Sequence, residues 1–166
     1  RFQPPLDVLS SIVDVCPELS LGLDCLERTP LHLAACWGCD PDVISALLGA
    51  AELQLANVTG LLLDKNEGDS FDAEYLSECL ERVAGKPDSQ GKTPLHYAIE
   101  FLSSQVSHQS HQNEEWDFVA MCTLAPVLDR AVAVVKILAE ACPDAIEMKD
   151  AQGKTPMDHV HYRVRG

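Results

Sequence analysis

Positive charge is scarce in this sequence, which has 12 Lys and Arg against 26 Asp and Glu and a formal net charge of −14 at pH 7. Such a surface repels phosphate backbones and anionic lipid, which argues against nucleic acid as a ligand. It speeds encounter with basic partners, or it serves solubility alone. The charge therefore excludes the nucleic-acid-binding class and leaves a basic protein partner as one option.

Long apolar runs are also missing. No stretch approaches the ~20 residues that a membrane helix needs, so membrane insertion is not expected. No basic segment followed by an apolar one indicates a signal peptide. The sequence begins at Arg1 rather than Met, and we expect a trimmed or processed chain that can have lost a targeting segment.

Cysteine is present without a disulfide framework. The seven cysteines, an odd number, show no spacing typical of a secreted disulfide scaffold. This pattern favours a reducing intracellular compartment, without distinguishing cytoplasm, nucleus and organelle interior.

Catalytic motifs are missing as well: there is no Gly-rich phosphate loop, GxSxG, HExxH or paired-carboxylate pattern. Residues 36–39, CWGC, have redox-site spacing but end a predicted helix, where the helix dipole disfavours a thiolate. His108 and His111 have one nearby cysteine, Cys122, whereas structural zinc needs four well-spaced ligands. We predict no enzyme, no cofactor and no metal.

The sequence does contain a repeated pattern, an aspartate followed by Thr-Pro. It occurs at Asp24/Thr29-Pro30, Asp88/Thr93-Pro94 and Asp150/Thr155-Pro156, the last two with Gly91 and Gly153 between. A decayed copy at 57–63 has leucines where Thr-Pro should stand. With the Thr position as marker, the copies fall at 29, 62, 93 and 155, so the steps are 33, 31 and 62 residues.

Apolar residues at helical spacing follow the turns, in 43–51, 76–83 and 134–142, and also occur in 9–16. Cys16-Pro17 and Cys142-Pro143 each close a helix, because proline cannot donate the next hydrogen bond. We expect helices near 6–16, 30–37, 41–51, 72–84, 94–103 and 127–142.

The stretch TPLHLAA at 29–35 and its near copy TPLHYA at 93–98 closely resemble the ankyrin repeat, with a partial copy, TPMD, at 155–158. The resemblance covers nearly the whole chain. It implies an all-α fold, an ankyrin-repeat solenoid of antiparallel helix pairs joined by β-turn hairpins.

The motif also has a local physical interpretation. Thr29 is the expected N-cap, its hydroxyl accepting a first-turn amide, and Pro30 follows at N1, where its missing N–H costs nothing. The resemblance implies that His32 and His96 bond backbone and threonine groups and tie adjacent turns together. The structural set is Thr29, Pro30, His32, Thr93, Pro94, His96, Thr155 and Pro156.

The expected layout is a single ankyrin-repeat domain over residues 1–166. It comprises a half-repeat at 6–16, repeats at about 24–52, 57–84 and 88–142, and a closing half-repeat at 149–164. The middle repeat is degenerate, with its first helix shortened to about 61–66. The last full repeat carries an insertion at about 104–126, where Trp116 and Phe118 are expected to make contacts.

The resemblance implies a non-catalytic protein–protein interaction module, a scaffold, adaptor or assembly factor, that binds a partner on the concave face of turn tips and first helices. Carried over by position, this face comprises Leu26, Arg28, Leu33, Trp37, Gln90, Lys92, Tyr97, Glu100, Phe101, Gln152, Lys154, His159, Tyr162 and Arg163. Trp37, Tyr97, Phe101 and Tyr162 should form an exposed aromatic row, and aromatic side chains often dominate binding energy.

Two alternatives stay open. The chain can instead be a structural subunit held permanently in a larger complex through the 104–126 insertion. The acidic residues between 64 and 81 are either a solvated helix face or a landing patch for a basic partner.

Overall fold

The computed structural model describes residues 6–58, 73–107 and 118–160, and for 56–58, 73–76, 107 and 118–124 it describes the backbone alone. These ranges are all-α, with no β-strand among them. The elements in chain order are α1 (Leu6–Val15), the 3-10 helix η1 (Pro17–Leu21), α2 (Pro30–Trp37), α3 (Pro41–Val58), α4 (Ala73–Ala84), α5 (Pro94–Ser107), α6 (Phe118–Ala141) and the 3-10 helix η2 (Pro143–Ile146). A last helical turn covers 158–160.

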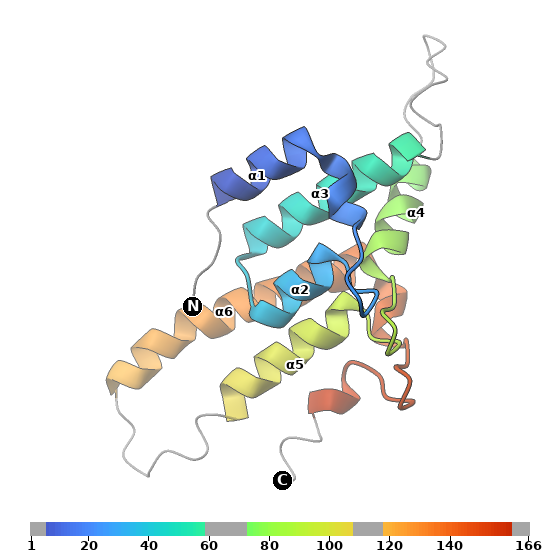
Figure 1. The fold of residues 1–166 in the computed structure, drawn as a ribbon. Coiled ribbons are helices and arrows are strands. Elements are labelled where there is room, and N and C mark those ends of the chain that lie inside the picture. Colours follow the sequence, from blue (N-terminus) through green and yellow to red (C-terminus); the bar gives the residue numbers. More distant parts are fainter. Residues whose placement is uncertain (1–5, 59–72, 108–117, 161–166) are drawn as a thin grey trace.

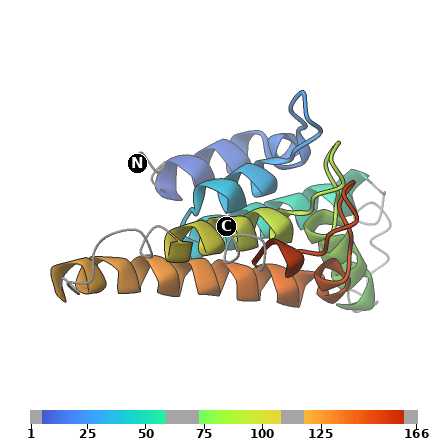
Figure 2. The ribbon, with the colours of Figure 1, turned by 90° about the horizontal axis from the view of Figure 1, so that it is seen from below.

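The helices stack in layers, each made of an inner helix that follows a turn and an outer helix that packs on it (Figure 1). α2 and α3 form one layer and α5 and α6 form the next, with α2 packed on α5 and α3 on α6. α1 packs on α3 at the other end of the stack. The turns before α2, before α5 and before the last helical turn lie side by side along one edge (Figure 2).

The core lies between these layers. Leu31, Ile44, Leu95 and Leu138, one from each of α2, α3, α5 and α6, are at most 2% exposed. Burying an aliphatic side chain of this size contributes about 1.5–3 kcal/mol. The stack is therefore held by apolar contacts that cross from each layer to the next.

The ends of α2 follow from local sequence. Thr29, in extended backbone (φ −80°, ψ 164°), forms a capping box with His32, and Pro30 occupies the first helical position. Gly38 ends the helix in the left-handed conformation (φ 64°, ψ 46°), and its amide bonds the carbonyls of Ala34 and Ala35. Glycine adopts this backbone conformation without the penalty that a Cβ brings.

The direct packing of α2 on α5 corrects the expected layout. His32 bonds the carbonyl of Lys92, 60 residues further along the chain, and His96 bonds that of Lys154, 58 residues further. The expectation that 57–84 forms a layer between them is therefore wrong. The repeat that begins at Asp24 continues to the turn at Asp88, whereas the repeat at 88–142 is already expected to be long because of its insertion. Leucines at 61–63 provide neither the N-cap nor the proline that starts an inner helix.

The segment 57–84 joins the stack in a different way. Its helix α4 packs against α3 and α6, on the outer side of the stack. The short helix expected at 61–66 lies outside the described residues.

Three helices are longer than expected. α3 continues to Val58 and α5 to Ser107. α6 begins at Phe118 rather than near 127, so the second half of the expected 104–126 insertion is helical. Pro126 lies inside α6, whereas the sequence predicts a helix start after it because proline disrupts helix interiors.

Candidate functional site

Three turns at one edge of the molecule share an arrangement built on an aspartate. Oδ1 of Asp24, Asp88 and Asp150 each accepts hydrogen bonds from two backbone amides of its own turn, at 2.8–3.0 Å. Aspartate favours turns for this reason. The sequence pattern singled out these residues, but it did not predict this role.

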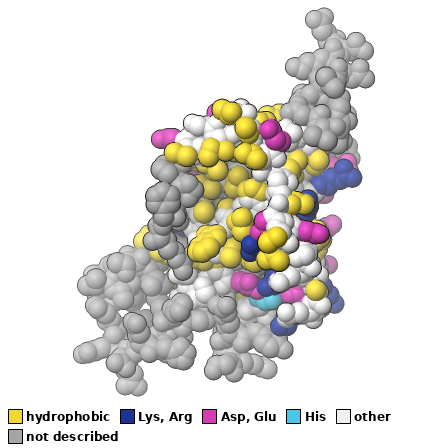
Figure 3. Space-filling model, in the orientation of Figure 1, with side chains coloured by type: hydrophobic (Ala, Val, Ile, Leu, Met, Phe, Trp, Pro, Cys, Tyr) yellow, Lys and Arg dark blue, Asp and Glu magenta, His cyan; other side chains and the backbone are white. Residues whose placement is uncertain are grey.

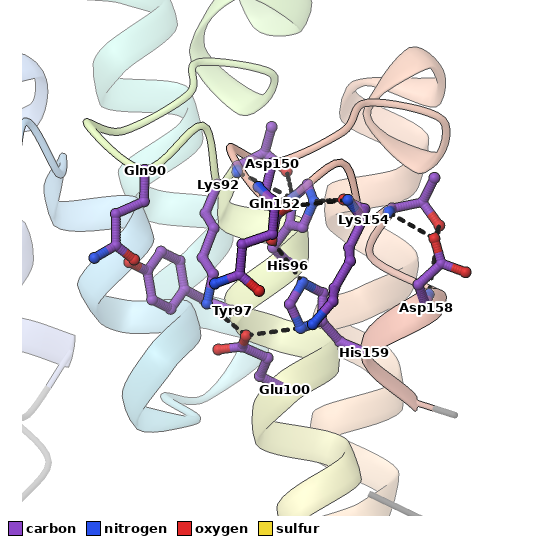
Figure 4. A network of polar contacts seen from close by, with 12 residues as sticks. Gln90, Lys92, His96, Tyr97, Glu100, Asp150, Gln152, Lys154, Asp158 and His159 are labelled. Atoms are coloured by element: carbon purple, nitrogen blue, oxygen red, sulfur yellow. Dashed lines mark hydrogen bonds and ion pairs between the residues drawn. The ribbon is translucent and has the colours of Figure 1, made fainter. Parts of the chain in front are cut away.

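In the second and third turns, the other carboxylate oxygen bonds a side chain on the following helix. Asp88 Oδ2 accepts from the Tyr97 hydroxyl at 2.7 Å. Asp150 Oδ2 lies 3.0 Å from His159 Nε2, and both of these residues are labelled in Figure 4. Burial and this hydrogen bond raise the pKa of Tyr97. Burial alone would raise the pKa of Asp150, but the turn amides and His159 outweigh it and lower that pKa.

In the first turn a different kind of side chain donates to the second carboxylate oxygen of the aspartate. The position equivalent to Tyr97 and His159 is Leu33, which has no donor, and Arg28 within the turn bonds Asp24 Oδ2 at 2.7 Å instead. The Arg28 hydrogen bond is the main cause that lowers the pKa of Asp24 to about 2. Arg28 is thereby engaged inside its own turn.

The turns also bond to one another. Ser89 N–H donates to the Leu26 carbonyl at 3.0 Å, and Ala151 N–H donates to the Gln90 carbonyl at 2.8 Å. Neighbouring turns are therefore linked as a ladder, which fixes the spacing of the inner helices behind them.

The two motif histidines join this ladder from inside. His32 Nδ1 lies 3.1 Å from the Thr29 amide, and His32 Nε2 lies 3.1 Å from the Lys92 carbonyl. An amide can only donate and a carbonyl can only accept, so Nδ1 accepts and Nε2 carries the proton. This geometry requires the neutral ring, and burial lowers the pKa of His32 in agreement.

His96 repeats this geometry one layer on. Its Nδ1 accepts from the Thr93 amide at 3.1 Å, its Nε2 lies 3.3 Å from the Lys154 carbonyl, and burial lowers its pKa as well. These are the contacts that the resemblance implied. Both rings are fully buried, at 0% exposure, and face no opening in which they could act on a substrate.

In the third copy an aspartate replaces the histidine. Asp158 Oδ2 accepts from the Thr155 amide and from the Thr155 hydroxyl, both at 2.8 Å. The cap thus survives the substitution, but a carboxylate cannot donate to a further carbonyl as Nε2–H does.

The inner face carries an exposed apolar surface over α2, where hydrophobic side chains gather near the centre of the view in Figure 3. Trp37 is 62% exposed, and Leu26, at the turn tip, is 38% exposed. Leu33, which lies between these two residues in the sequence, is half-buried. Three of the predicted face residues are therefore available to a partner.

The predicted aromatic row is wrong at Tyr97. This ring is only 8% exposed, stands edge-on to His32 and carries the hydroxyl that bonds Asp88. Phe101 is half-buried, and a Cβ placed on Gly38 would overlap its ring. The sequence pattern could not show that the tyrosine hydroxyl has a buried acceptor, because that acceptor comes from the turn.

Polar side chains form a network beside this apolar surface (Figure 4). Lys92 Nζ lies 2.6 Å from Glu100 Oε1 and 5.4 Å from the centre of the Tyr97 ring. His159 Nδ1 lies 3.1 Å from Glu100 Oε1, and its Nε2 lies 3.0 Å from Asp150 Oδ2, so each ring nitrogen faces a carboxylate. Lys92, Glu100 and His159 are thus brought together as expected neighbours on one face, but they are bonded to each other.

The structure describes three of the remaining predicted binding residues, and the others lie partly or wholly outside the described residues. Gln90 and Gln152 are exposed at the turn tips, and Lys154 is half-buried. Tyr162, Arg163 and Trp116 lie outside the described residues, and for Phe118 only the backbone at the start of α6 is described.

The described part of the chain bears on two further kinds of site, a redox pair of cysteines and a metal site. Burial raises the pKa of the Cys36 and Cys39 thiols, which disfavours the thiolate that redox exchange needs. No group of three or more His, Cys, Asp and Glu residues lies close enough together there to hold a metal ion. His108 and His111 lie outside the described residues.

Stacked helix pairs, each opened by a hairpin turn, define a repeat solenoid in which each layer contacts its neighbours. Residues 26–66 match the family model of the ankyrin repeat. The chain is therefore an ankyrin repeat protein. No curated protein shows a significant match to the sequence.

Ankyrin repeats generally mediate protein–protein interaction, and the family is typically non-catalytic. The described helices include none long and apolar enough to cross a membrane.

Proposed function

We propose that this chain is a non-catalytic protein-binding module, a scaffold, adaptor or assembly factor, and that it holds its partner along the turn tips and the inner helix α2. The observation that carries the proposal is the exposed side chain of Trp37, 62% accessible at the end of α2, one helical turn beyond Leu33 and on the helix that follows the turn of Leu26. Large aromatics in such positions supply much of the energy of protein interfaces.

The charges on this face suit a partner segment of low net charge. Arg28 is paired with Asp24, and Lys92 is paired with Glu100, so both cations are neutralised locally. Exposed carboxylates lie on the outer helices, at Asp42, Glu78, Glu81, Asp129 and Glu140, and at the first turn tip, at Glu27. A basic partner, if one binds, is therefore expected on the outer helices rather than over Trp37.

Capture of partners by the wild-type chain and by Trp37→Ala, compared by quantitative mass spectrometry, tests the proposal. A partner bound at this face should be depleted from the Trp37→Ala sample, because loss of a central aromatic typically costs about 2 kcal/mol, or roughly thirtyfold in affinity. Val132→Ala, at a 40% exposed position on α6, is the matched control and should keep the partner.

Folding is checked separately, since Trp37 is exposed and its loss should leave the thermal midpoint nearly unchanged. An identical set of partners for wild-type and Trp37→Ala would remove Trp37 from the binding face and with it the main support for the proposal.

The alternative role, a subunit fixed in a larger complex through residues 104–126, depends on Trp116 and Phe118, whose side chains are not among those described. Co-expression of Trp116→Ala and Phe118→Ala variants with a captured partner tests it. Loss of soluble complex in these variants, with Trp37→Ala unaffected, would favour that role.

A further inference from the structure

Helix α1 lies at one end of the described stack, where it packs on α3 and η1, yet none of its ten residues is buried. Aliphatic side chains on a helix face that no other described element covers are candidates for a binding surface.

Four exposed aliphatic side chains form a stripe on α1 and on the 3-10 helix η1 that follows it. Val8, Ile12, Val15 and Leu19 are 49%, 48%, 79% and 52% exposed. On α1, Val8, Ile12 and Val15 follow the four-then-three spacing of a helix that pairs with another helix, and Leu19 lies beyond its end, in η1. Val8, Ile12 and Val15 also line a shallow groove of about 500 Å³, together with Asp7, Ser11 and Cys16.

The borders of this stripe carry charge of one sign. Asp7, Asp14 and Glu18 are exposed beside it, and residues 6–27 contain no Lys or Arg. In Figure 3 hydrophobic side chains at the top of the molecule are accompanied by acidic ones. Two copies of the chain paired through this stripe would place acidic borders against each other, which disfavours self-association.

We propose that the stripe of Val8, Ile12, Val15 and Leu19 docks an amphipathic helix of another protein, one whose apolar face is flanked by Lys or Arg. The aliphatic side chains supply burial, as in other complexes where a helix occupies a groove. The acidic borders select for basic flanks and against acidic ones. This stripe lies on α1 and η1, whereas Trp37 lies on α2, so different substitutions test the two surfaces.

A designed three-heptad peptide, with leucine at its a and d positions and lysine at e and g, is a direct probe. Titration of the labelled peptide with the full chain, followed by fluorescence anisotropy, should show saturable binding. Val15→Asp should weaken it at least about tenfold, because a buried aliphatic contact is lost. Non-specific attraction would instead grow, since the substitution makes the protein more acidic.

The controls separate the alternatives. Val132→Asp on α6 and Trp37→Ala should leave peptide affinity unchanged, and a scrambled peptide of the same composition should bind weakly. No binding by the lysine-flanked peptide, or equal binding by a glutamate-flanked one, would overturn the proposal. Sedimentation showing a wild-type dimer that Val15→Asp dissociates would also overturn it, because a second copy would then occupy the stripe.

Discussion

Each turn aspartate divides its carboxylate between the backbone, through Oδ1, and one side chain, through Oδ2. The side-chain partner changes from Arg28 to Tyr97 to His159 along the stack. The turn geometry is therefore kept constant while the side-chain donor varies, from Arg28 within the first turn to residues on the following helix in the other two. Because Arg28 donates to Asp24, the position equivalent to Tyr97 and His159 needs no polar side chain. Leu33 occupies it and is part of the apolar face.

Glu27 has positive φ (60°), at the position that Gly91 (φ 74°) and Gly153 (φ 75°) occupy in the other two turns. A residue with a Cβ is strained there by about 1–2 kcal/mol. Glu27→Gly should therefore raise the free energy of unfolding by about 1 kcal/mol net, after allowing for the greater freedom of glycine in the unfolded chain. Urea denaturation followed by circular dichroism measures the change.

The reverse substitution in the second turn serves as the control. Gly91→Ala should lower the free energy of unfolding by at least about 1–2 kcal/mol, because the backbone there is left-handed and the new Cβ would lie 2.9 Å from the Ala151 amide nitrogen. If Glu27→Gly proved destabilising, the strain at Glu27 would be smaller than the entropy that glycine loses on folding.

Burial lowers the pKa of His32 and His96 below the value near 6.5 that an exposed histidine has. Between these values the unfolded chain binds more protons than the folded chain, so the free energy of unfolding should fall as pH drops below about 6.5. The slope is at most about 1.4 kcal/mol per pH unit for each ring. Urea denaturation between pH 7.5 and pH 5 measures it.

His96→Gln isolates the contribution of one ring. The substitution can change the free energy of unfolding at pH 7.5 in either direction. Between pH 7.5 and pH 5, however, the free energy of unfolding of the variant should fall less steeply than that of the wild type. Asp24 does not interfere, because its pKa of about 2 against 3.8 places its effect at much lower pH. An unchanged slope in His96→Gln would mean that its protonation is not linked to unfolding.

The C-terminal end of α2 packs closely against Phe101 of α5. A Cβ on Gly38 would overlap the Phe101 ring, and the backbone there is left-handed. Gly38→Ala should therefore cost about 1–2 kcal/mol for the conformation and about 1–3 kcal/mol for the overlap. Differential scanning calorimetry should show a clearly lower midpoint.

The same substitution at Gly49 should have the opposite sign. Gly49 lies exposed within α3, and a Cβ there would meet no atom within 4 Å. Gly49→Ala should therefore stabilise the protein by about 0.5–1 kcal/mol, since alanine loses less entropy in a helix. Equal effects of the two substitutions would contradict the packing argument.

The molecule as a whole has an uneven charge distribution, with a formal net charge of −14 and paired cations on its inner face. Self-repulsion among carboxylates destabilises the compact state, and salt screens it. Raising NaCl from about 0.01 M to about 0.1 M, which shortens the Debye length from ~30 Å to ~10 Å, should raise the urea midpoint.

Potassium chloride at the same concentrations should give the same increase, since screening does not depend on the identity of a monovalent cation. A midpoint that falls with salt would show that ion pairs such as Lys92–Glu100 and Arg130–Asp40 outweigh the repulsion.

Local sequence was sufficient where one residue type satisfies one short-range requirement. Thr29-Pro30 and Thr93-Pro94 predicted the helix starts, periodic apolar residues predicted helices, and the resemblance of the TPLH motifs to the ankyrin repeat implied an all-α repeat fold. Caps, turns and amphipathic stripes are set within a few residues along the chain, so a pattern in the sequence carries them directly.

Only the tertiary structure decided which repeat packs on which. The sequence predicts a layer at 57–84 because its spacing fits, whereas His32 reaches Lys92, 60 residues away, and leaves no layer between α2 and α5. Tyr97 is likewise buried rather than exposed, because its hydroxyl donates to Asp88 in the turn that precedes the helix. The packing of one layer on the next depends on which surfaces bury each other across the stack, and no local pattern specifies that choice.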